Sequence, residues 1–154
     1  MTAMLDVSTE IIIDRPLECV SSFAADPDNV PAWYVNIKSV EWETEQPAAV
    51  GTRIAFVAHF LGRPLAYTYE IVELVPGERL VMRTCEGPFP METSYAWTAV
   101  DGRRTHMKLR NRGQPTGFSR LVSPLMSWMV RRANRKDLAR LKHLLERSVP
   151  RQPF

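Results

Sequence analysis

Cysteine is scarce in this sequence. Cys19 and Cys85 are the only two among 154 residues, and their spacing matches no metal-binding motif. Two cysteines cannot build the framework of several disulfide bonds that stabilises many small secreted domains. We therefore expect both to be free thiols in a reducing compartment.

The motifs of several enzyme classes are also missing. The seven glycines never form a phosphate-binding loop, and no serine lies in a nucleophile elbow. The histidines His59, His106 and His143 are far apart in the sequence and lack a companion cluster of carboxylates, so we expect no metal site. We place all three histidines on the surface, and the sequence predicts no cofactor.

Signals for export or membrane insertion are absent as well. The start of the chain lacks the basic and long apolar regions of a signal peptide, and no run of about 18 apolar residues occurs. We expect a cytoplasmic protein with no stable membrane insertion. The net charge is +3, and much of the positive charge lies in the last third. We interpret that charge as a solvated face and expect no nucleic-acid partner.

The first two thirds of the chain alternate between apolar and polar residues with the period of two that indicates β-strands. A first strand is expected over Leu5–Ile13, and a short helix over Pro16–Ala25 follows with Asp14 as its N-cap. Residues 28–33 predict a turn or a second short helix. Six more strands are expected in succession, over residues 37–43, 51–60, 65–74, 79–85, 91–100 and 104–111.

Short turns join most of these strands, so neighbours in the sequence should pair antiparallel. The connection over residues 61–64 is expected to be a hairpin, and Val75-Pro76-Gly77-Glu78 predicts a type II turn. One face of the resulting sheet is apolar and aromatic and the other is polar, so one face needs a cover.

The last third of the chain predicts a long helix that could supply this cover. It runs to Arg147 from Pro124, with Ser123 as a cap, or from an earlier start near Ser119. Its apolar stripe at helical spacing comprises Val122, Met126, Met129, Val130, Ala133, Leu138, Leu141, Leu144 and Leu145. The fold class is therefore α+β: about seven antiparallel strands, curved around the long C-terminal helix, with two short helices after the first strand.

This arrangement resembles the START-like helix-grip superfamily, and within it the polyketide cyclase/dehydrase-like (SRPBCC) proteins. The residues that carry the resemblance are Arg15 to Trp33, Val50-Gly51-Thr52, Val75 to Leu80, and Gly113 to Phe118. The resemblance covers nearly the whole chain and implies a single START-like domain over residues 1–154. It also implies a mostly apolar cavity between sheet and helix. The superfamily shares no catalytic motif, so the resemblance assigns no catalytic residue.

Side chains with inward parity are rich in aromatic rings and methionine. Tyrosine and tryptophan need polar partners when buried, and methionine adapts to irregular shapes, so together with the resemblance they favour a small-molecule pocket over a closed core. The ligand-binding residues expected are Trp33, Phe56, Tyr67, Tyr69, Met82, Tyr95, Trp97, Met107, Met126, Met129 and Asn134.

Two polar residues interrupt the apolar stripe of the last helix. Asn134 and Asp137 stand three residues apart and therefore share one side of it. They could anchor a ligand, or Asp137 could act as a general acid or base, which makes it the one weak catalytic candidate. The alternative is that both lie near the edge of the stripe and bond Arg110, Arg112 or the sheet.

The start of the last helix is apolar nearly all round. Leu121, Leu125 and Trp128 lie opposite the core stripe and need a cover of their own. That cover could be the loop around Trp33 and Tyr34, a second copy in a homodimer, or a membrane.

Three functions remain open from the sequence. The first is binding of a hydrophobic small molecule, which could be a lipid, a polyketide or an aromatic compound. The second is a cofactor-independent cyclase or dehydrase, which requires a titratable group with a perturbed pKa in the cavity. The third is a protein-interaction domain that uses the apolar outer face of the last helix.

Overall fold

The computed structural model describes residues 5–60, 62–87, 90–113 and 123–147, without the side chains of Phe60, Ser123, Pro124 and Met126. Its elements are β1 (Leu5–Ile13), α1 (Leu17–Ala25), η1 (Pro27–Asn29), α2 (Val30–Trp33), β2 (Ile37–Trp42), β3 (Arg53–Phe60), β4 (Arg63–Val75), β5 (Arg79–Glu86), β6 (Met91–Ala99), β7 (Thr105–Gly113) and α3 (Ser123–Arg147).

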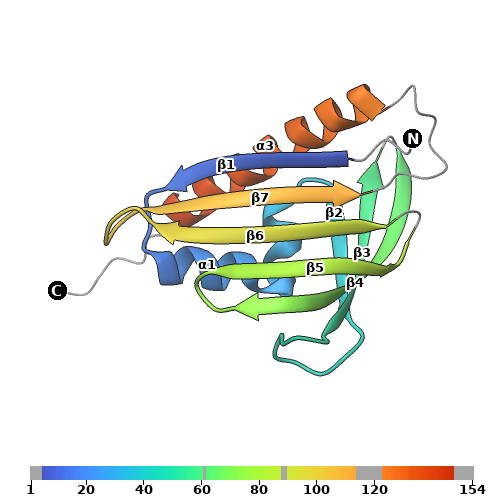
Figure 1. Cartoon of the computed structure of the whole chain (residues 1–154), viewed down its shortest axis with the longest axis horizontal. Coiled ribbons are helices and arrows are strands. Elements are labelled where there is room, and N and C mark those ends of the chain that lie inside the picture. The colour runs from blue at the N-terminus through green and yellow to red at the C-terminus, as the bar shows by residue number, and fades with distance from the viewer. Residues whose placement is uncertain (1–4, 61, 88–89, 114–122, 148–154) are drawn as a thin grey trace.

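All seven strands belong to one antiparallel sheet in the order β1-β7-β6-β5-β4-β3-β2. Six of them follow one another in the chain, with short connections everywhere except between β2 and β3, and β1 pairs with β7 to complete the sheet. Figure 1 shows β2 and β3 running steeply across the direction of β1 and β7, with the three α-helices behind the sheet. This is the predicted α+β helix-grip arrangement.

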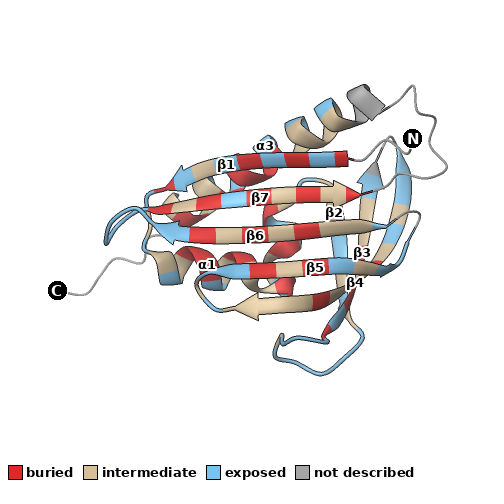
Figure 2. Ribbon diagram, viewed as in Figure 1, coloured by how far each residue is buried: buried red, intermediate tan, exposed pale blue. Residues whose placement is uncertain are grey.

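The period-two pattern has the expected physical result. In β1 the side chains of Leu5, Val7 and Ile13 are buried, whereas those of Ser8 and Glu10 are exposed. Figure 2 shows the same alternation of buried and exposed residues along β7 and β6. One face of the sheet therefore supplies the core.

The C-terminal half of α3 closes this core. Leu138, Leu141 and Leu145 leave no more than 4% of their surface exposed. They belong to one continuous hydrophobic cluster with residues of α1, α2 and six strands. The predicted apolar stripe of this half of the helix is confirmed.

Several element boundaries differ from the prediction, each for a local reason. The β3–β4 connection is shorter than residues 61–64, because Phe60 already pairs with Arg63 and Gly62 takes a left-handed conformation with φ 75°. The strand β3 begins at Arg53 because Gly51 has φ 95°. The strand β7 extends to Gly113, which pairs with Leu5 on one side and Met91 on the other.

The predicted N-cap of the first helix is wrong. Pro16 occupies that position and makes no side-chain cap bond. The backbone N–H of Asp14 instead donates to a carboxylate oxygen of Glu146, 2.8 Å away, and so ties the end of β1 to the end of α3. The predicted second short helix is present as η1 and α2, and the possible start of α3 near Ser119 lies outside the described residues.

Candidate functional site

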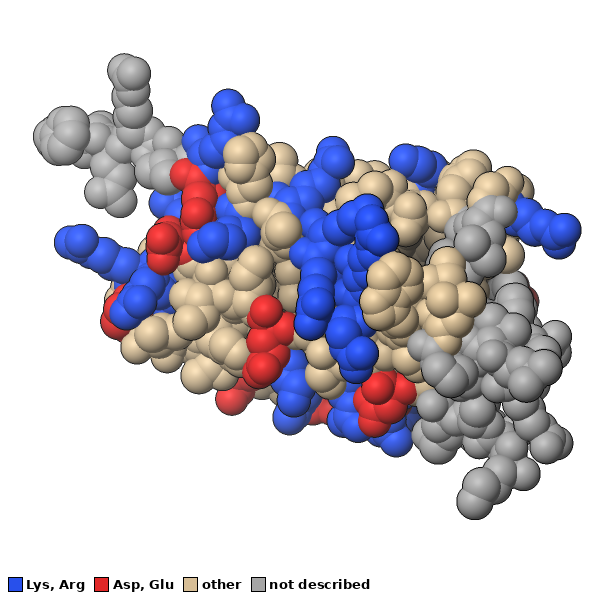
Figure 3. All heavy atoms as spheres, turned by 90° about the horizontal axis from the view of Figure 1, so that it is seen from above, with Lys and Arg blue, Asp and Glu red and all other residues tan. Residues whose placement is uncertain are grey.

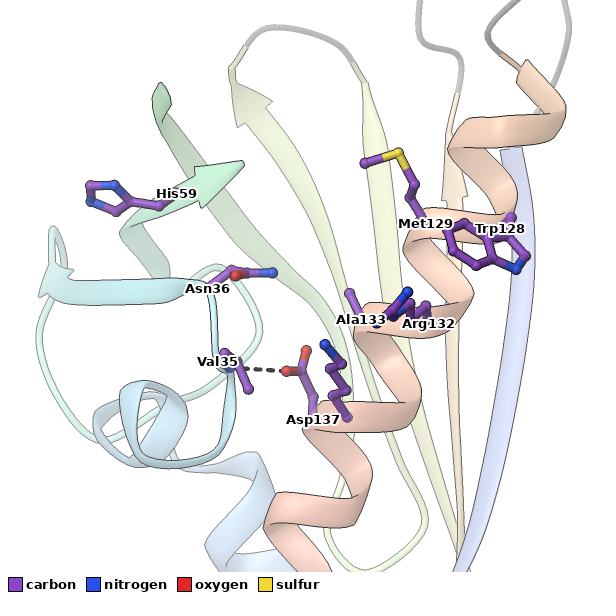
Figure 4. Close-up of a pocket in the computed structure, with 9 residues that line it drawn as sticks. Val35, Asn36, His59, Trp128, Met129, Arg132, Ala133 and Asp137 are labelled. Atoms are coloured by element: carbon purple, nitrogen blue, oxygen red, sulfur yellow. Dashed lines mark hydrogen bonds between the residues drawn. The ribbon is translucent and has the colours of Figure 1, made fainter. Parts of the chain in front are cut away.

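A pocket opens between α3, the loop after α2 and the end of β3. Its volume is about 310 Å³, at the lower end of the range for small-molecule sites. Figure 4 shows Asn36 and Met129 pointing into this space from opposite sides, while the His59 ring points away from it. The lining residues are Val35, Asn36, His59, Trp128, Met129, Arg132, Ala133, Lys136 and Asp137.

Asp137 joins the two walls of the pocket. Its side chain is only 3% exposed, and its Oδ1 accepts a hydrogen bond from the backbone N–H of Val35 at 2.9 Å (Figure 4). Burial raises the pKa of Asp137 to about 7, although the Val35 N–H and the positive charge of Arg140 act in the opposite direction. The carboxyl group can therefore both hold and release a proton near neutral pH.

Two tyrosine hydroxyls meet inside the core. The hydroxyl oxygens of Tyr34 and Tyr95 lie 2.5 Å apart, and either one could be the donor. Their rings belong to a chain of aromatic contacts in which the Trp33 ring centroid lies 4.3 Å from that of Tyr34 and 5.6 Å from that of Tyr95. The next contact joins Tyr95 to Trp97, at 6.0 Å.

A second set of polar side chains in the interior comes from β4, β6 and β7. Tyr69 shares a side-chain hydrogen bond with Thr93, and the Thr93 hydroxyl donates to Oδ1 of Asn111 at 2.8 Å. Burial raises the pKa of Tyr69 to about 12, and burial also raises the pKa of Tyr34 and of Tyr95. These phenols stay neutral at physiological pH, so they can donate hydrogen bonds but cannot serve as ionised bases.

Other buried donors have no partner within the described part of the chain. Besides Nε of Arg15 and of Arg112, three of them are Nδ2 of Asn134 and the ring nitrogens Nε1 of Trp33 and Trp97. Each of the three residues is at most 4% exposed. An unpaired buried N–H is costly, so the interior contains donors that suit a polar atom of a ligand.

The structure separates the predicted ligand-binding residues into groups. Trp33, Phe56, Met82, Tyr95, Trp97 and Met107 are buried in the hydrophobic cluster, and Asn134 is buried on α3. Tyr67 and Tyr69 are partly buried in a second aromatic group, in which the Tyr69 ring contacts Phe56 edge-on at 5.8 Å and Tyr67 at 6.1 Å. Of the predicted set, only Met129 lines the pocket beside α3, and the Met126 side chain lies outside the described part.

The alternative positions considered for Asn134 and Asp137 are wrong. Both residues are buried rather than at the edge of the stripe, and Asp137 bonds the Val35 backbone instead of Arg110 or Arg112. Arg110, which the sequence suggested as a partner for these residues, instead donates two hydrogen bonds to Asp6 on β1.

Several residues of the site were missed by the sequence patterns, three of them in one segment. Tyr34, Val35 and Asn36 lie in the irregular segment between α2 and β2, where no periodicity predicts a direction. The one available indication was that Tyr34 follows Trp33 directly. Two adjacent aromatic residues next to a proline-containing turn rarely both face solvent, because their apolar area is large.

The remaining sequence expectations concern the surface and metal ions. His59 is exposed, His106 lies 3.1 Å from Glu10 across the strands, and His143 is exposed on α3. The described residues contain no group of three or more His, Cys, Asp or Glu side chains that could hold a metal ion. None of the helices in the described ranges is both long enough and apolar enough to cross a membrane.

A curved antiparallel sheet closed by one long C-terminal helix, with short helices after the first strand, is the helix-grip fold of START-like proteins. The chain belongs to the polyketide cyclase/dehydrase and lipid transport family, whose sequence profile matches residues 4–146. The resemblance found in the sequence is therefore confirmed. The family's description includes both enzymes and transport proteins, which agrees with the predicted choice between a cyclase or dehydrase and a binder of hydrophobic molecules.

Solved structures share this fold at low sequence identity. The Zhui aromatase/cyclase from Streptomyces sp. R1128 is 17% identical, with a TM-score of 0.80 over 96% of this chain and 97% of that one. A START superfamily protein from Mycobacterium smegmatis is 12% identical, with a TM-score of 0.81 over 92% and 97%. A protein from Thermus thermophilus is 21% identical, with a TM-score of 0.80 over 94% and 99%. No curated protein matches the sequence.

Proposed function

We propose that the protein is a START-like domain that binds a hydrophobic small molecule between the sheet and α3. The ligand class is that of a lipid, a polyketide or another aromatic compound. The observation that carries the proposal is the pocket between α3 and the loop after α2, where apolar walls meet a few polar groups. The family's lipid-transport members and the aromatase/cyclase neighbour support the ligand class.

The polar groups suit a ligand with oxygen atoms along an apolar skeleton. Asp137 lies at the pocket, and the neutral hydroxyls of Tyr34 and Tyr95 lie deeper in the core. Neutral phenols and amide N–H groups bind carbonyl and hydroxyl oxygens without the desolvation cost of an ion. Ligand specificity would then depend on hydrogen bonds, while apolar burial supplies most of the affinity.

Filling the pocket tests the proposal. Ala133 lines it from α3, and replacement by Trp would occupy its volume. The fluorescent fatty acid cis-parinaric acid serves as probe, and Val50→Trp is the control because Val50 is 65% exposed and lies outside the pocket. We expect Ala133→Trp to weaken probe binding about tenfold or more and Val50→Trp to leave it unchanged. Equal binding by both folded variants would contradict the proposal.

A cyclase or dehydrase is the second candidate, and the raised pKa of Asp137 favours it. Ring closure by an aldol-type reaction needs only proton transfers. A base removes a proton from the carbon beside one carbonyl, that carbon bonds to a second carbonyl carbon, and the resulting alkoxide takes up a proton to become a hydroxyl. A second proton then leaves the same α-carbon while the hydroxyl is protonated and departs as water, which forms a C=C bond. A carboxyl group with a pKa of about 7 can perform the proton transfers in both directions, and the scheme needs no oxidant and no cofactor.

Asp137→Asn separates the two candidates. The amide cannot exchange a proton at neutral pH, but its oxygen can still accept the Val35 N–H bond. Retained binding of cis-parinaric acid with loss of turnover on an aromatic polyketide would favour the enzyme. If the wild-type protein binds cis-parinaric acid but turns over no aromatic polyketide, the result would favour a binding protein without catalysis.

The proposed location in the cell rests on the two cysteines. Cys19 and Cys85 are both free thiols, which is the state expected in a reducing compartment. We place the protein in the cytoplasm and include no nucleic acid among its partners.

A further inference from the structure

The outer side of α3 carries an exposed line of residues that the ligand pocket does not explain. Leu125, Trp128, Arg132, Arg135 and Ala139 follow one another at spacings of three and four residues, so they stack on one side of the helix. All five are exposed, and Leu125 and Trp128 leave 55% and 54% of their surface uncovered. Large apolar side chains that remain this exposed next to each other mark an interaction surface.

Positive charge surrounds the apolar end of this line. Arg131, Arg132, Arg135 and Lys136 lie on or beside it, and in the described part of the chain none of the four forms an ion pair. The nearest acid in the sequence, Asp137, is buried. Figure 3 looks onto this side of the molecule and shows Lys and Arg gathered across its middle beside uncharged surface.

Trp128 and Arg132 are held together. The guanidinium carbon of Arg132 lies 5.5 Å from the centroid of the Trp128 ring, which is the geometry of a cation–π contact. The contact presents one flat apolar surface with a positive charge at its edge. A partner for this side must therefore accept apolar side chains and positive charge at the same place.

Two of the possible covers fail this requirement. The loop around Trp33 and Tyr34 does not cover the patch, because Trp33 is fully buried in the core and Trp128 remains half exposed. A second copy in a two-fold dimer would bring four basic side chains against the same four of its partner. Like charges at such close range disfavour that dimer.

We infer that this side of α3 docks on the surface of an anionic lipid bilayer. Leu125 and Trp128 would enter the interfacial layer, where tryptophan is favoured because it joins an apolar ring to a polar N–H. Arg131, Arg132, Arg135 and Lys136 would lie against acidic headgroups. Two apolar side chains and a basic face describe peripheral and reversible attachment, in keeping with the absence of a membrane-spanning helix from the described ranges.

The docking surface adjoins the pocket. Trp128, Arg132 and Lys136 line the pocket as well as this side of α3. A docked molecule would therefore hold the opening of its pocket at the bilayer surface. The docking itself depends only on the outer side of the helix and does not require the proposed ligand.

Vesicle sedimentation tests the inference on the full chain. We expect binding to vesicles of phosphatidylcholine with phosphatidylglycerol, little binding to phosphatidylcholine alone, and loss of binding as salt is raised. Addition of the acidic vesicles should shift the tryptophan emission to the blue, and Trp128→Phe should remove that shift. Absence of binding to acidic vesicles at low salt would overturn the inference.

Paired variants separate docking from simple charge attraction. The double variant Leu125→Ala/Trp128→Ala should weaken vesicle binding about tenfold, because both side chains lose their place in the interface. The matched controls are Val50→Ala and Arg103→Gln, which alter an exposed apolar and an exposed basic residue elsewhere. Unchanged vesicle binding by the double variant would refute docking on a bilayer. So would a wild-type protein that forms dimers at high concentration, if the double variant no longer forms them.

Discussion

Asp137 and Val35 are joined by a 2.9 Å hydrogen bond although they lie 102 positions apart in the chain. The bond connects the middle of α3 to the segment between α2 and β2. It fixes one wall of the pocket relative to the other, and it places a buried carboxyl group in the pocket lining. The protonation state of the Asp137 carboxyl group is therefore linked to the contact that joins the two walls of the pocket.

Asp137→Asn should change how stability depends on pH. In the folded chain the pKa of Asp137 is about 7, whereas an unfolded chain has a value near 3.8. Between these values the folded state binds more protons, so this group makes the free energy of unfolding fall as pH rises from about 4 to about 7. The variant lacks this decrease and should gain stability relative to the wild type over that range, by roughly 4 kcal/mol at most.

Urea unfolding of both proteins at several pH values between about 4 and 8 measures the difference. A difference between the two proteins that does not change with pH would contradict the raised pKa. Replacement of the surface residue Glu45 by Gln provides the control for removal of one negative charge, because Glu45 is exposed.

The hydroxyls of Tyr34 and Tyr95 should contribute to stability as a pair. Tyr34→Phe or Tyr95→Phe alone leaves the other hydroxyl buried without this partner, at a cost of about 1–3 kcal/mol. Removal of both hydroxyls leaves no orphan group. We therefore expect the double variant to lose less stability than the sum of the two single variants, as measured by urea unfolding. Strict additivity would show that the two hydroxyls do not depend on each other.

Gly113 should not tolerate a side chain. A Cβ atom at this position would lie 2.8 Å from the carbonyl oxygen of Pro90 and 2.5 Å from the sulfur of Met91. We expect Gly113→Ala to lower the free energy of unfolding by about 1–3 kcal/mol, because the backbone at Pro90 must move. Gly102→Ala is the control, since a Cβ there meets no atom within 4 Å, and thermal unfolding should show little change for it.

The two sides of α3 should respond differently to truncation. Leu141 is fully buried, so Leu141→Ala should cost about 2–5 kcal/mol of stability. Leu125 is 55% exposed, and Leu125→Ala should stay within about 0.5 kcal/mol of the wild type. Chemical unfolding of both variants checks this. A large loss of stability for Leu125→Ala would mean that its side chain contributes to the folded core.

The sequence predicted the fold well because each strand reports its inward face through its own alternation. Val7 and Ile13 on β1, and Met107 and Leu109 on β7, are buried as their parity requires. The same holds for Leu141 on α3, whose stripe follows helical spacing. Patterns of this kind depend on residues close together in the sequence, so no knowledge of distant contacts is needed.

The site was harder to predict because its contacts join distant segments. The helical pattern put Asp137 on the inner side of α3, but its partner is a backbone N–H, and every non-proline residue carries one. Tyr34 lies in a segment without periodicity, so the sequence could not show that its hydroxyl meets that of Tyr95. Which inward side chains line an open pocket depends on how the whole sheet curves, and no local pattern records that.

The pairing of β1 with β7 also determines the order in which the chain can fold during synthesis. Leu5 to Ile13 are synthesised long before their strand partners, Thr105 to Gly113. The nascent β1 must wait for about a hundred further residues before its ladder can form, and for α3 before its inner face is covered. During that interval its apolar residues Val7, Ile11 and Ile13 lack their final partners. Apolar surface exposed in this way makes a nascent chain prone to aggregation, and β1 keeps such surface exposed longer than the strands whose neighbours follow directly.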